Sequence, residues 1–255
     1  MSSAFRTLMR SPHAITRSLA DRVLREFDPF APTESDRTWD HAVPAARAFG
    51  SDGERFRDEA LAHLHSGPVR QRVGVLCTLD RLRLVGAMFE EVAALVSDKD
   101  QRVAAKAVHL LGKSGDARAV RVLESVLDHA DPRVRAEGVE GLWRMGALMD
   151  YGRWAEDDTP RVRANALRAL MRVDEGAAVR GVEAMLNDPR ATHRAAGLWL
   201  AEVGGGTGGL VELTQIAIEM AKRETDPITV PRARRCATRL LARSRLVWAG
   251  SDGTS

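Results

Sequence analysis

Hydrophobic residues recur at helical spacing through the middle of the chain. After each of three arginines, Arg102, Arg133 and Arg161, apolar or small residues stand one, three, five, six and nine positions later. This spacing covers one stripe of an α-helix and does not fit the alternation of a β-strand. The three predicted stripes are Val103, Ala105, Ala107, Val108 and Leu111; Val134, Ala136, Gly138, Val139 and Leu142; and Val162, Ala164, Ala166, Leu167 and Leu170.

The small residue at the fifth position of each stripe (Ala107, Gly138 or Ala166) is expected to let a neighbouring helix approach closely. The helices also begin alike. An aspartate before a helix can accept hydrogen bonds from the free N–H groups of the first turn, and proline suits the first helical position. The starts recur as Asp100-Gln-Arg102, Asp131-Pro-Arg133, Asp158-Thr-Pro-Arg161 and Asp188-Pro-Arg190, with arginine spacings of 31, 28 and 29. A start and stripe repeated at this interval indicate a helical repeat.

A second, shorter helix is predicted after each first helix. Residues 119–127 (AVRVLESVL) match residues 178–186 (AVRGVEAML) at an offset of 59. The corresponding stretch between them, residues 150–158 (DYGRWAEDD), departs from this pattern. Tyr151 and Trp154 stand there in place of Val120 and Leu123, and the predicted helix is about three residues shorter.

These residues resemble the HEAT-repeat family, specifically the short HEAT-like repeats of phycobilisome lyase subunits. The resemblance covers about residues 68–204, with a degenerate first unit at Pro68–Val96. It implies an all-α fold, a right-handed α-solenoid (α-α superhelix) of stacked helix pairs, and a binding scaffold more often than an enzyme. It also implies a structural ladder between adjacent units, formed by Asp100, Arg102, Asp131, Arg133, Asp158, Arg161, Asp188 and Arg190.

The segments on either side of the repeats are predicted to cap them, as solenoids require. Residues 1–67 form the N-terminal helical capping region, although its basic start could instead touch a membrane or act as a targeting sequence. Residues 205–249 form the C-terminal helical cap, with helices at Leu210–Arg223 and Pro231–Trp248, and residues 250–255 a disordered tail. The glycine-rich run at 204–209 is interpreted as a helix terminator and turn.

Composition excludes few functions. The net charge of +3 is mild and does not by itself argue for nucleic acid. Cys77 and Cys236 lie far apart, without metal-binding or redox spacing, which favours a cytoplasmic protein with reduced thiols. No apolar run approaches the length of a transmembrane segment.

No catalytic constellation appears in the sequence. The seven histidines are scattered, and no nucleophile motif, paired-carboxylate site or dinucleotide fingerprint is present. The glycine-rich run lacks the Lys-Ser/Thr of a nucleotide-binding loop. The sequence therefore predicts no catalytic residue, no metal site and no cofactor, and offers no positive reason to propose an enzyme.

Two sets of residues on the second helices are candidates for contacts with a partner protein. Tyr151 and Trp154 either fill the core beside the shortened helix or form a binding hot spot. A second set recurs at equivalent places on helices that the resemblance assigns to the concave face. It forms either a solvated surface or a charged row for a partner, and consists of Arg121, Glu124, Arg180 and Glu183.

The last helix carries the strongest local charge. Arginines at helical spacing lie along one side of it, either as the solubilising face of a cap or as an anion-binding site. They are Arg232, Arg235, Arg239 and Arg243.

The leading hypothesis is a non-enzymatic HEAT-like scaffold that binds another protein through its concave face, with the partner and the oligomeric state left open. One alternative is a nucleic-acid-binding protein that uses the C-terminal arginine helix. Another, which rests on the resemblance alone, is a bilin lyase-like protein that handles a tetrapyrrole.

Overall fold

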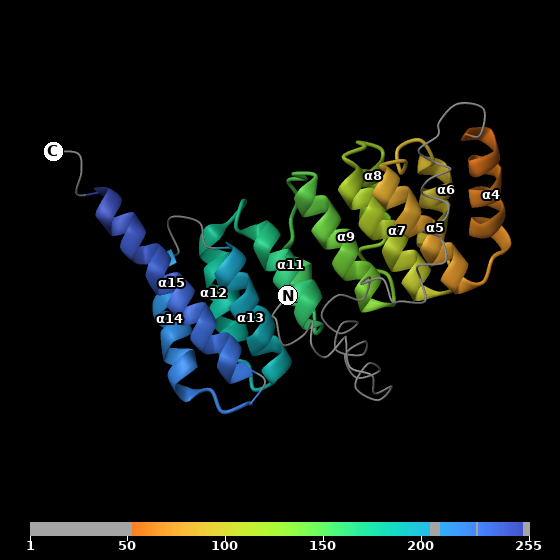
Figure 1. The fold of residues 1–255 in the computed structure, drawn as a ribbon. Helices are drawn as coiled ribbons and strands as arrows, with labels where there is room; N and C mark the ends of the chain where they lie inside the picture. Colours follow the sequence, from red (N-terminus) through yellow and green to blue (C-terminus); the bar gives the residue numbers. More distant parts are fainter. Residues whose placement is uncertain (1–52, 205–209, 228, 252–255) are drawn as a thin grey trace, which may run out of the picture. The chain divides into compact units, whose positions relative to one another are not determined.

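The computed structural model describes residues 53–204, 210–227 and 229–251. Every regular element within these ranges is helical, and none is a strand (Figure 1). The predicted all-α class is confirmed. The expectations for residues 1–52, for the loop at 205–209 and for residues 252–255 fall outside the described residues, as do the side chains of residues 243–251.

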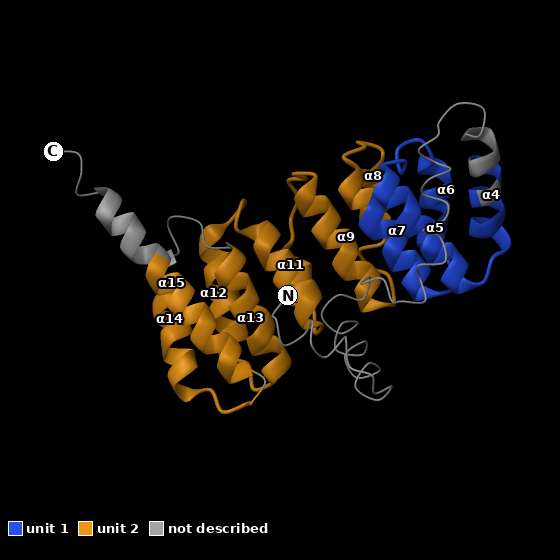
Figure 2. Ribbon diagram, viewed as in Figure 1, with its two compact units in different colours: residues 1–110 blue, residues 111–255 orange. Residues whose placement is uncertain are grey.

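The chain divides into two compact units, Met1–Leu110 and Leu111–Ser255 (Figure 2). The boundary falls inside helix α7 (Gln101–Ser114). In the first unit the helices are α4 (Gly53–Ser66), α5 (Val69–Leu82), α6 (Phe89–Ala94) and the short 3-10 helix η2 (Leu95–Ser97). The predicted degenerate unit is thus a long first helix, α5, followed by a short second helix, α6.

The second unit alternates long first helices with second helices. It contains α8 (Ala119–Ser125), α9 (Pro132–Arg144), α10 (Gly152–Ala155), α11 (Pro160–Leu170), α12 (Glu175–Leu186), α13 (Ala191–Gly204), α14 (Leu210–Arg223) and α15 (Thr229–Ser251). The first helices α9, α11 and α13 pack side by side, and α15 packs against α13. Figure 1 shows α12 to α15 packed together at the C-terminal end of this unit. Stacked helix pairs of this kind are the repeating architecture of an α-solenoid.

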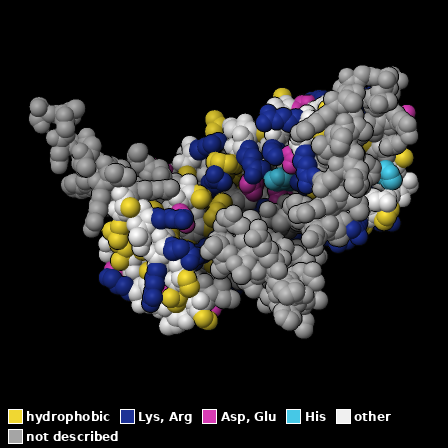
Figure 3. Space-filling view, in the orientation of Figure 1, with side chains coloured by type: hydrophobic (Ala, Val, Ile, Leu, Met, Phe, Trp, Pro, Cys, Tyr) yellow, Lys and Arg dark blue, Asp and Glu magenta, His cyan; other side chains and the backbone are white. Residues whose placement is uncertain are grey.

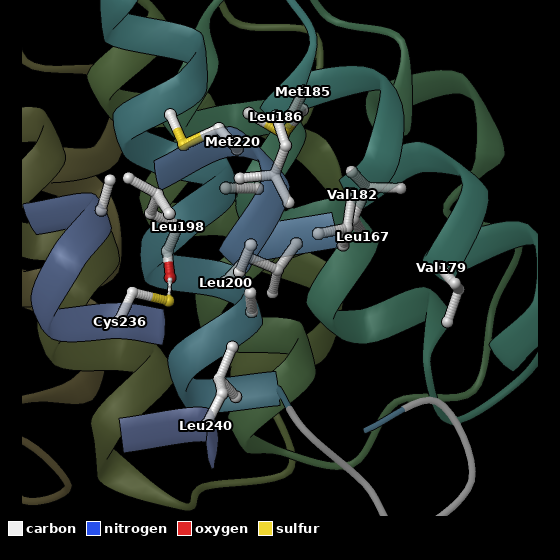
Figure 4. Packing of buried hydrophobic residues seen from close by; sticks show 14 residues of the cluster. Leu167, Val179, Val182, Met185, Leu186, Leu198, Leu200, Met220, Cys236 and Leu240 are labelled. Atoms are coloured by element: carbon white, nitrogen blue, oxygen red, sulfur yellow. Dashed lines mark hydrogen bonds between the residues drawn. The ribbon is translucent and has the colours of Figure 1, made fainter. Parts of the chain in front are cut away.

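The predicted apolar stripes form the core. All fifteen residues of the three stripes are buried, apart from Leu170, which is partly buried. Around α11 to α15 they join side chains from the second helices and the C-terminal helices, as Figure 4 shows for Leu167, Val182 and Leu198. Each fully buried aliphatic side chain of this size contributes roughly 1.5–3 kcal/mol. Burial of these stripes therefore holds the repeats together.

Glycine allows close helix contacts in the second unit. A Cβ atom at Gly138 would lie 3.0 Å from Cγ2 of Val126 and 3.3 Å from the carbonyl oxygen of Leu123. The second helix α8 therefore approaches α9 as the small residue at the fifth position predicted. Gly112 and Gly141 bring α7 and α9 closer still, since a Cβ at Gly112 would lie 2.5 Å from Cα of Gly141.

Aspartates cap the first helices, with one correction. Asp100, Asp131 and Asp188 each accept a hydrogen bond from the backbone N–H two residues later, at 2.8–3.0 Å. Asp158 was expected to do the same for α11, and this is wrong. Thr159 stands at the N-cap position of α11 and its side chain makes no cap hydrogen bond, while Asp157 accepts from the N–H of Thr159 at 2.7 Å.

Of the residues predicted to form a ladder between units, Arg161 contacts the preceding unit, where it pairs with Glu137. The guanidinium groups of Arg102, Arg133 and Arg190 bind the aspartates of their own turns. Different arginines, two to four positions further along the chain, donate to carbonyl groups before their own helix and to an acid of the next unit. These ion pairs are Arg72–Asp98 at 3.0 Å, Arg135–Asp157 at 3.0 Å and Arg194–Glu224 at 2.7 Å.

Candidate functional site

The arginines and glutamates predicted on the second helices are exposed, but they do not form ion pairs with each other. Arg121 and Glu124 lie on α8, and Arg180 and Glu183 lie on α12, with all four side chains exposed. In the part of the chain that the structure describes, no ion pair joins the arginine and glutamate of either helix. The short helix α10, which comes between α8 and α12 in the chain, packs mainly against α11. These residues are therefore separate surface charges.

Tyr151 belongs to the core. Its side chain is only 1 % exposed, and its hydroxyl donates a hydrogen bond of 2.9 Å to the carbonyl oxygen of Ala147. Burial raises the pKa of the Tyr151 hydroxyl. A buried ring cannot contact a partner directly. Of the two roles predicted for Tyr151, the structure therefore supports packing in the core and not a place in a binding hot spot.

Trp154 ties the shortened helix to the preceding unit. Helix α10 has four residues where α8 has seven, in agreement with the predicted shortening. The indole Nε1–H of Trp154 donates to the carbonyl oxygen of Leu127 at 3.1 Å, and Arg153 pairs with Asp128 at 3.0 Å. Trp154 is partly buried.

The predicted arginine row of α15 is not a uniform charged surface. Arg239 pairs with Glu202 of α13, which offsets its charge. Arg232 is partly buried, and burial, followed by the nearby charge of Arg235, lowers the pKa of its guanidinium. Arg235 is exposed. The side chain of Arg243 lies outside the described residues.

The structure gathers aromatic and arginine side chains on another surface, which the sequence analysis missed. The guanidinium carbon of Arg168, on α11, lies 3.5 Å from the ring centroid of Trp143 on α9 and 5.6 Å from that of Trp199 on α13. Arg172 lies 4.7 Å from the Trp143 ring and donates to the carbonyl oxygen of Trp143 at 3.0 Å. Both tryptophans and Arg168 are partly buried, and Arg172 is exposed.

The packing of three first helices brings these residues together. Glu140 and Arg168 each stand seven residues after the repeat arginine of their helix, Trp199 stands nine residues after Arg190, and Trp143 and Arg172 lie about one turn further along their helices. Because α9, α11 and α13 lie side by side, equivalent positions form a row across them. We call this surface the Trp–Arg face, and it comprises Trp143, Arg168, Arg172 and Trp199 with Glu137, Glu140, Arg144 and Arg161 beside them. The sequence signal for this surface, which the sequence analysis did not use, is a charged or aromatic residue at about the same place in each of the three first helices.

The acidic residues on the Trp–Arg face form ion pairs with some of its arginines but not with Arg168 or Arg172. Glu137 is buried and pairs with Arg161. Glu140 pairs with Arg144 at 2.6 Å and reaches Arg161 at 3.5 Å. Among the described residues, no carboxylate lies within ion-pair distance of Arg168 or Arg172. The face thus has a local surplus of positive charge around Arg168.

That surplus affects Arg168 itself. Burial lowers the pKa of its guanidinium, Glu140 opposes this effect, and the nearby charges of Arg144 and Arg172 add to it. An arginine remains cationic in proteins even so. Placing an additional carboxylate beside Arg168 would therefore relieve repulsion between neighbouring cations.

Exposed apolar side chains follow the two helices that carry Trp143 and Arg168. Leu148, which follows α9, is 79 % exposed, and Val173, which follows α11, is 53 % exposed. Figure 3 shows hydrophobic and basic side chains interspersed over the described part of one face of the molecule. Apolar residues beside arginine and tryptophan are typical of surfaces that bind other proteins.

The described residues contain no group of three or more His, Cys, Asp or Glu side chains that could hold a metal ion. Nor does any described helix combine the length and the apolar character needed to cross a membrane.

Comparison with protein families identifies the repeat. Residues 90–151, from α6 to the N-terminal side of α10, match the model of HEAT repeats. This segment is therefore similar to HEAT repeats. The matched segment includes the first complete repeat, with α7 and α8, and helix α9 of the next. No curated protein matches the sequence.

Several solved structures are similar to the chain, at low identity. The complex of CpcE and CpcF of phycocyanin lyase from Nostoc sp. PCC7120 has a TM-score of 0.46 and 14% identity, covering 92% of this chain and 93% of that one. One engineered protein has a TM-score of 0.41 and 19% identity, covering 94% and 68%. A second has 0.33 and 18%, covering 95% and 98%. With TM-scores below 0.5, none of these supports an argument about the function of the HEAT repeats.

Proposed function

We propose that this protein is a non-enzymatic HEAT-repeat scaffold that binds another protein through the Trp–Arg face. One observation carries the proposal: Arg168 lies between two partly exposed tryptophans and has no carboxylate partner among the described residues. Tryptophan and arginine are the residues most enriched in binding hot spots. The first helices thus present, across three repeats, the side chains that protein interfaces use most.

The other surfaces have weaker support. Isolated exposed charges such as Arg121 and Glu183 contribute little to binding on their own, so the proposed interface does not include them. Nucleic-acid binding through α15 is less favoured because Arg239 is already paired with Glu202. Tetrapyrrole handling rests on family resemblance alone. A cytoplasmic location is part of the proposal, because Cys77 and Cys236 lie far apart in the sequence, without metal-binding or redox spacing.

Affinity purification from the native cell tests the proposal. The tagged wild-type protein is compared with Trp143→Ala and Arg172→Glu, and with Arg121→Glu as a control of equal charge change on α8. We expect a protein that wild type and Arg121→Glu retain to be lost by both face variants, and to bind again when the purified components are mixed. Equal capture by all four proteins, with helicity preserved in circular dichroism, would refute binding through this face.

A further inference from the structure

The guanidinium group of Arg168 is held in place but has unused hydrogen-bond donors. Its carbon lies over the Trp143 ring, 3.5 Å from the ring centroid, which is a close cation–π contact. A guanidinium held by a ring face can still donate from its N–H groups to a planar anion. In the described part of the chain, Arg168 donates no hydrogen bond to the protein.

The surroundings of Arg168 also lack a negative charge. Three arginines, Arg144, Arg168 and Arg172, influence one another there, and Glu140 is the one acidic residue that acts on Arg168. Glu140 is already engaged with Arg144 at 2.6 Å. The fold has therefore positioned a cation and its donors without supplying an acceptor.

From this geometry, and on the basis of the proposed function, we infer that Arg168 receives a carboxylate of the partner protein. The partner presents an acidic segment in which an Asp or Glu side chain is flanked by aliphatic residues. The carboxylate binds the free edge of the Arg168 guanidinium, with Arg172 as a second donor. The aliphatic neighbours pack on Leu148 and Val173, which lie at the adjoining ends of α9 and α11.

An acidic protein segment fits this surface better than a nucleic acid does. Glu140 of α9 lies on this surface and is only partly buried, so a continuous row of phosphates would pass close to its carboxylate, which a single side-chain carboxylate can avoid. The ring of Trp143 is also covered by Arg168 and Arg172, which leaves less of its face for stacking on a base.

The test uses a fluorescently labelled peptide with alternating glutamate and leucine as the probe, and anisotropy at low salt as the readout. Arg168→Met keeps most of the aliphatic stem and removes the charge and the donors. We expect at least tenfold weaker binding for Arg168→Met, about threefold to tenfold for Arg168→Lys, which keeps the charge without the planar fork, and less than twofold for the control Arg121→Met. Circular dichroism confirms that each variant is folded.

A second readout locates the contact. In a nitrogen-15 spectrum, the Nε–H signal of Arg168 is shifted by the ring currents of the tryptophans, disappears in Arg168→Lys and moves when the peptide is added. Failure of wild type to bind the peptide, or equal binding by wild type and Arg168→Met, would overturn the inference. So would tighter binding of an oligothymidylate of equal length that also depends on Arg168.

The two proposals fail separately. If the native partner is lost by Trp143→Ala and Arg172→Glu but retained by Arg168→Met, the face binds a protein and Arg168 is not its carboxylate receptor. If no native partner depends on the face at all, the proposed function itself is wrong.

Discussion

Arg194 and Glu224 form a bidentate ion pair between α13 and the residue that follows α14. Nε and Nη2 of Arg194 donate to the two carboxylate oxygens of Glu224 at 2.7 and 2.8 Å. The Glu224 side chain is 2 % exposed and also accepts from the N–H groups of Thr225 and Asp226. The hydrogen bonds from Arg194 lower the pKa of Glu224 from 4.5 to about 2.

This pair makes the stability of the second unit depend on pH. Because the pKa of Glu224 is lower in the folded state, its contribution is complete above pH 4.5 and is lost as the pH falls toward about 2. We expect Glu224→Gln to lower the free energy of unfolding by about 2 kcal/mol at pH 7. The difference from wild type should shrink at pH 3, measured by urea unfolding with circular dichroism. Glu183→Gln, on the exposed side of α12, is the matched control; a difference unchanged down to pH 2.5 would contradict the prediction.

The buried carboxylate of Glu137 depends on Arg161. The side chain of Glu137 is 0 % exposed, and Arg161 pairs with it from the next repeat. Removing the arginine leaves a buried charge without this partner, so we expect Arg161→Ala to cost roughly 2 kcal/mol. Arg161→Ala combined with Glu137→Gln should cost less than Arg161→Ala alone, in a double-mutant cycle of urea unfolding. Arg133→Ala, which removes an exposed partner of Asp131, should change stability by less than about 0.5 kcal/mol.

Gly112 tests the close contact between α7 and α9. A Cβ atom there would lie 2.5 Å from Cα of Gly141, so the two backbones must separate to accept alanine. Alanine gains about 1 kcal/mol of helix propensity, but overpacking costs roughly 1–3 kcal/mol. We expect Gly112→Ala to lower the melting temperature. Gly86→Ala, with no atom within 4 Å of the new Cβ, should leave it nearly unchanged; a more stable Gly112→Ala would show that the contact is loose.

Substitutions of Tyr151 should affect stability and spare partner binding. Tyr151→Phe loses the hydrogen bond to the Ala147 carbonyl, at a cost of about 1 kcal/mol, and Tyr151→Ala adds a cavity, for a total of roughly 3–5 kcal/mol. Unfolding measurements check both values. Tyr151→Phe should capture the same partner as wild type. Loss of the partner by this well-folded variant would show that Tyr151 does contribute to the binding surface.

The sequence alone determined the repeat interval, the buried stripes and most helix starts. These depend on local properties, since apolar spacing defines the face that a helix buries and an aspartate caps the turn that follows it. The shortened helix α10 was predicted in the same way, from the loss of pattern around Tyr151 and Trp154.

Only the tertiary structure decided which side chains cross between repeats. Arg133 and Arg135 are two residues apart at one helix start. Arg133 binds Asp131 of its own turn, whereas Arg135 pairs with Asp157 of the next unit. Trp143, Arg168 and Trp199 are likewise far apart in the chain and meet because α9, α11 and α13 lie side by side. Such contacts depend on how far each helix is shifted along its neighbour, and helix periodicity carries no information about that shift.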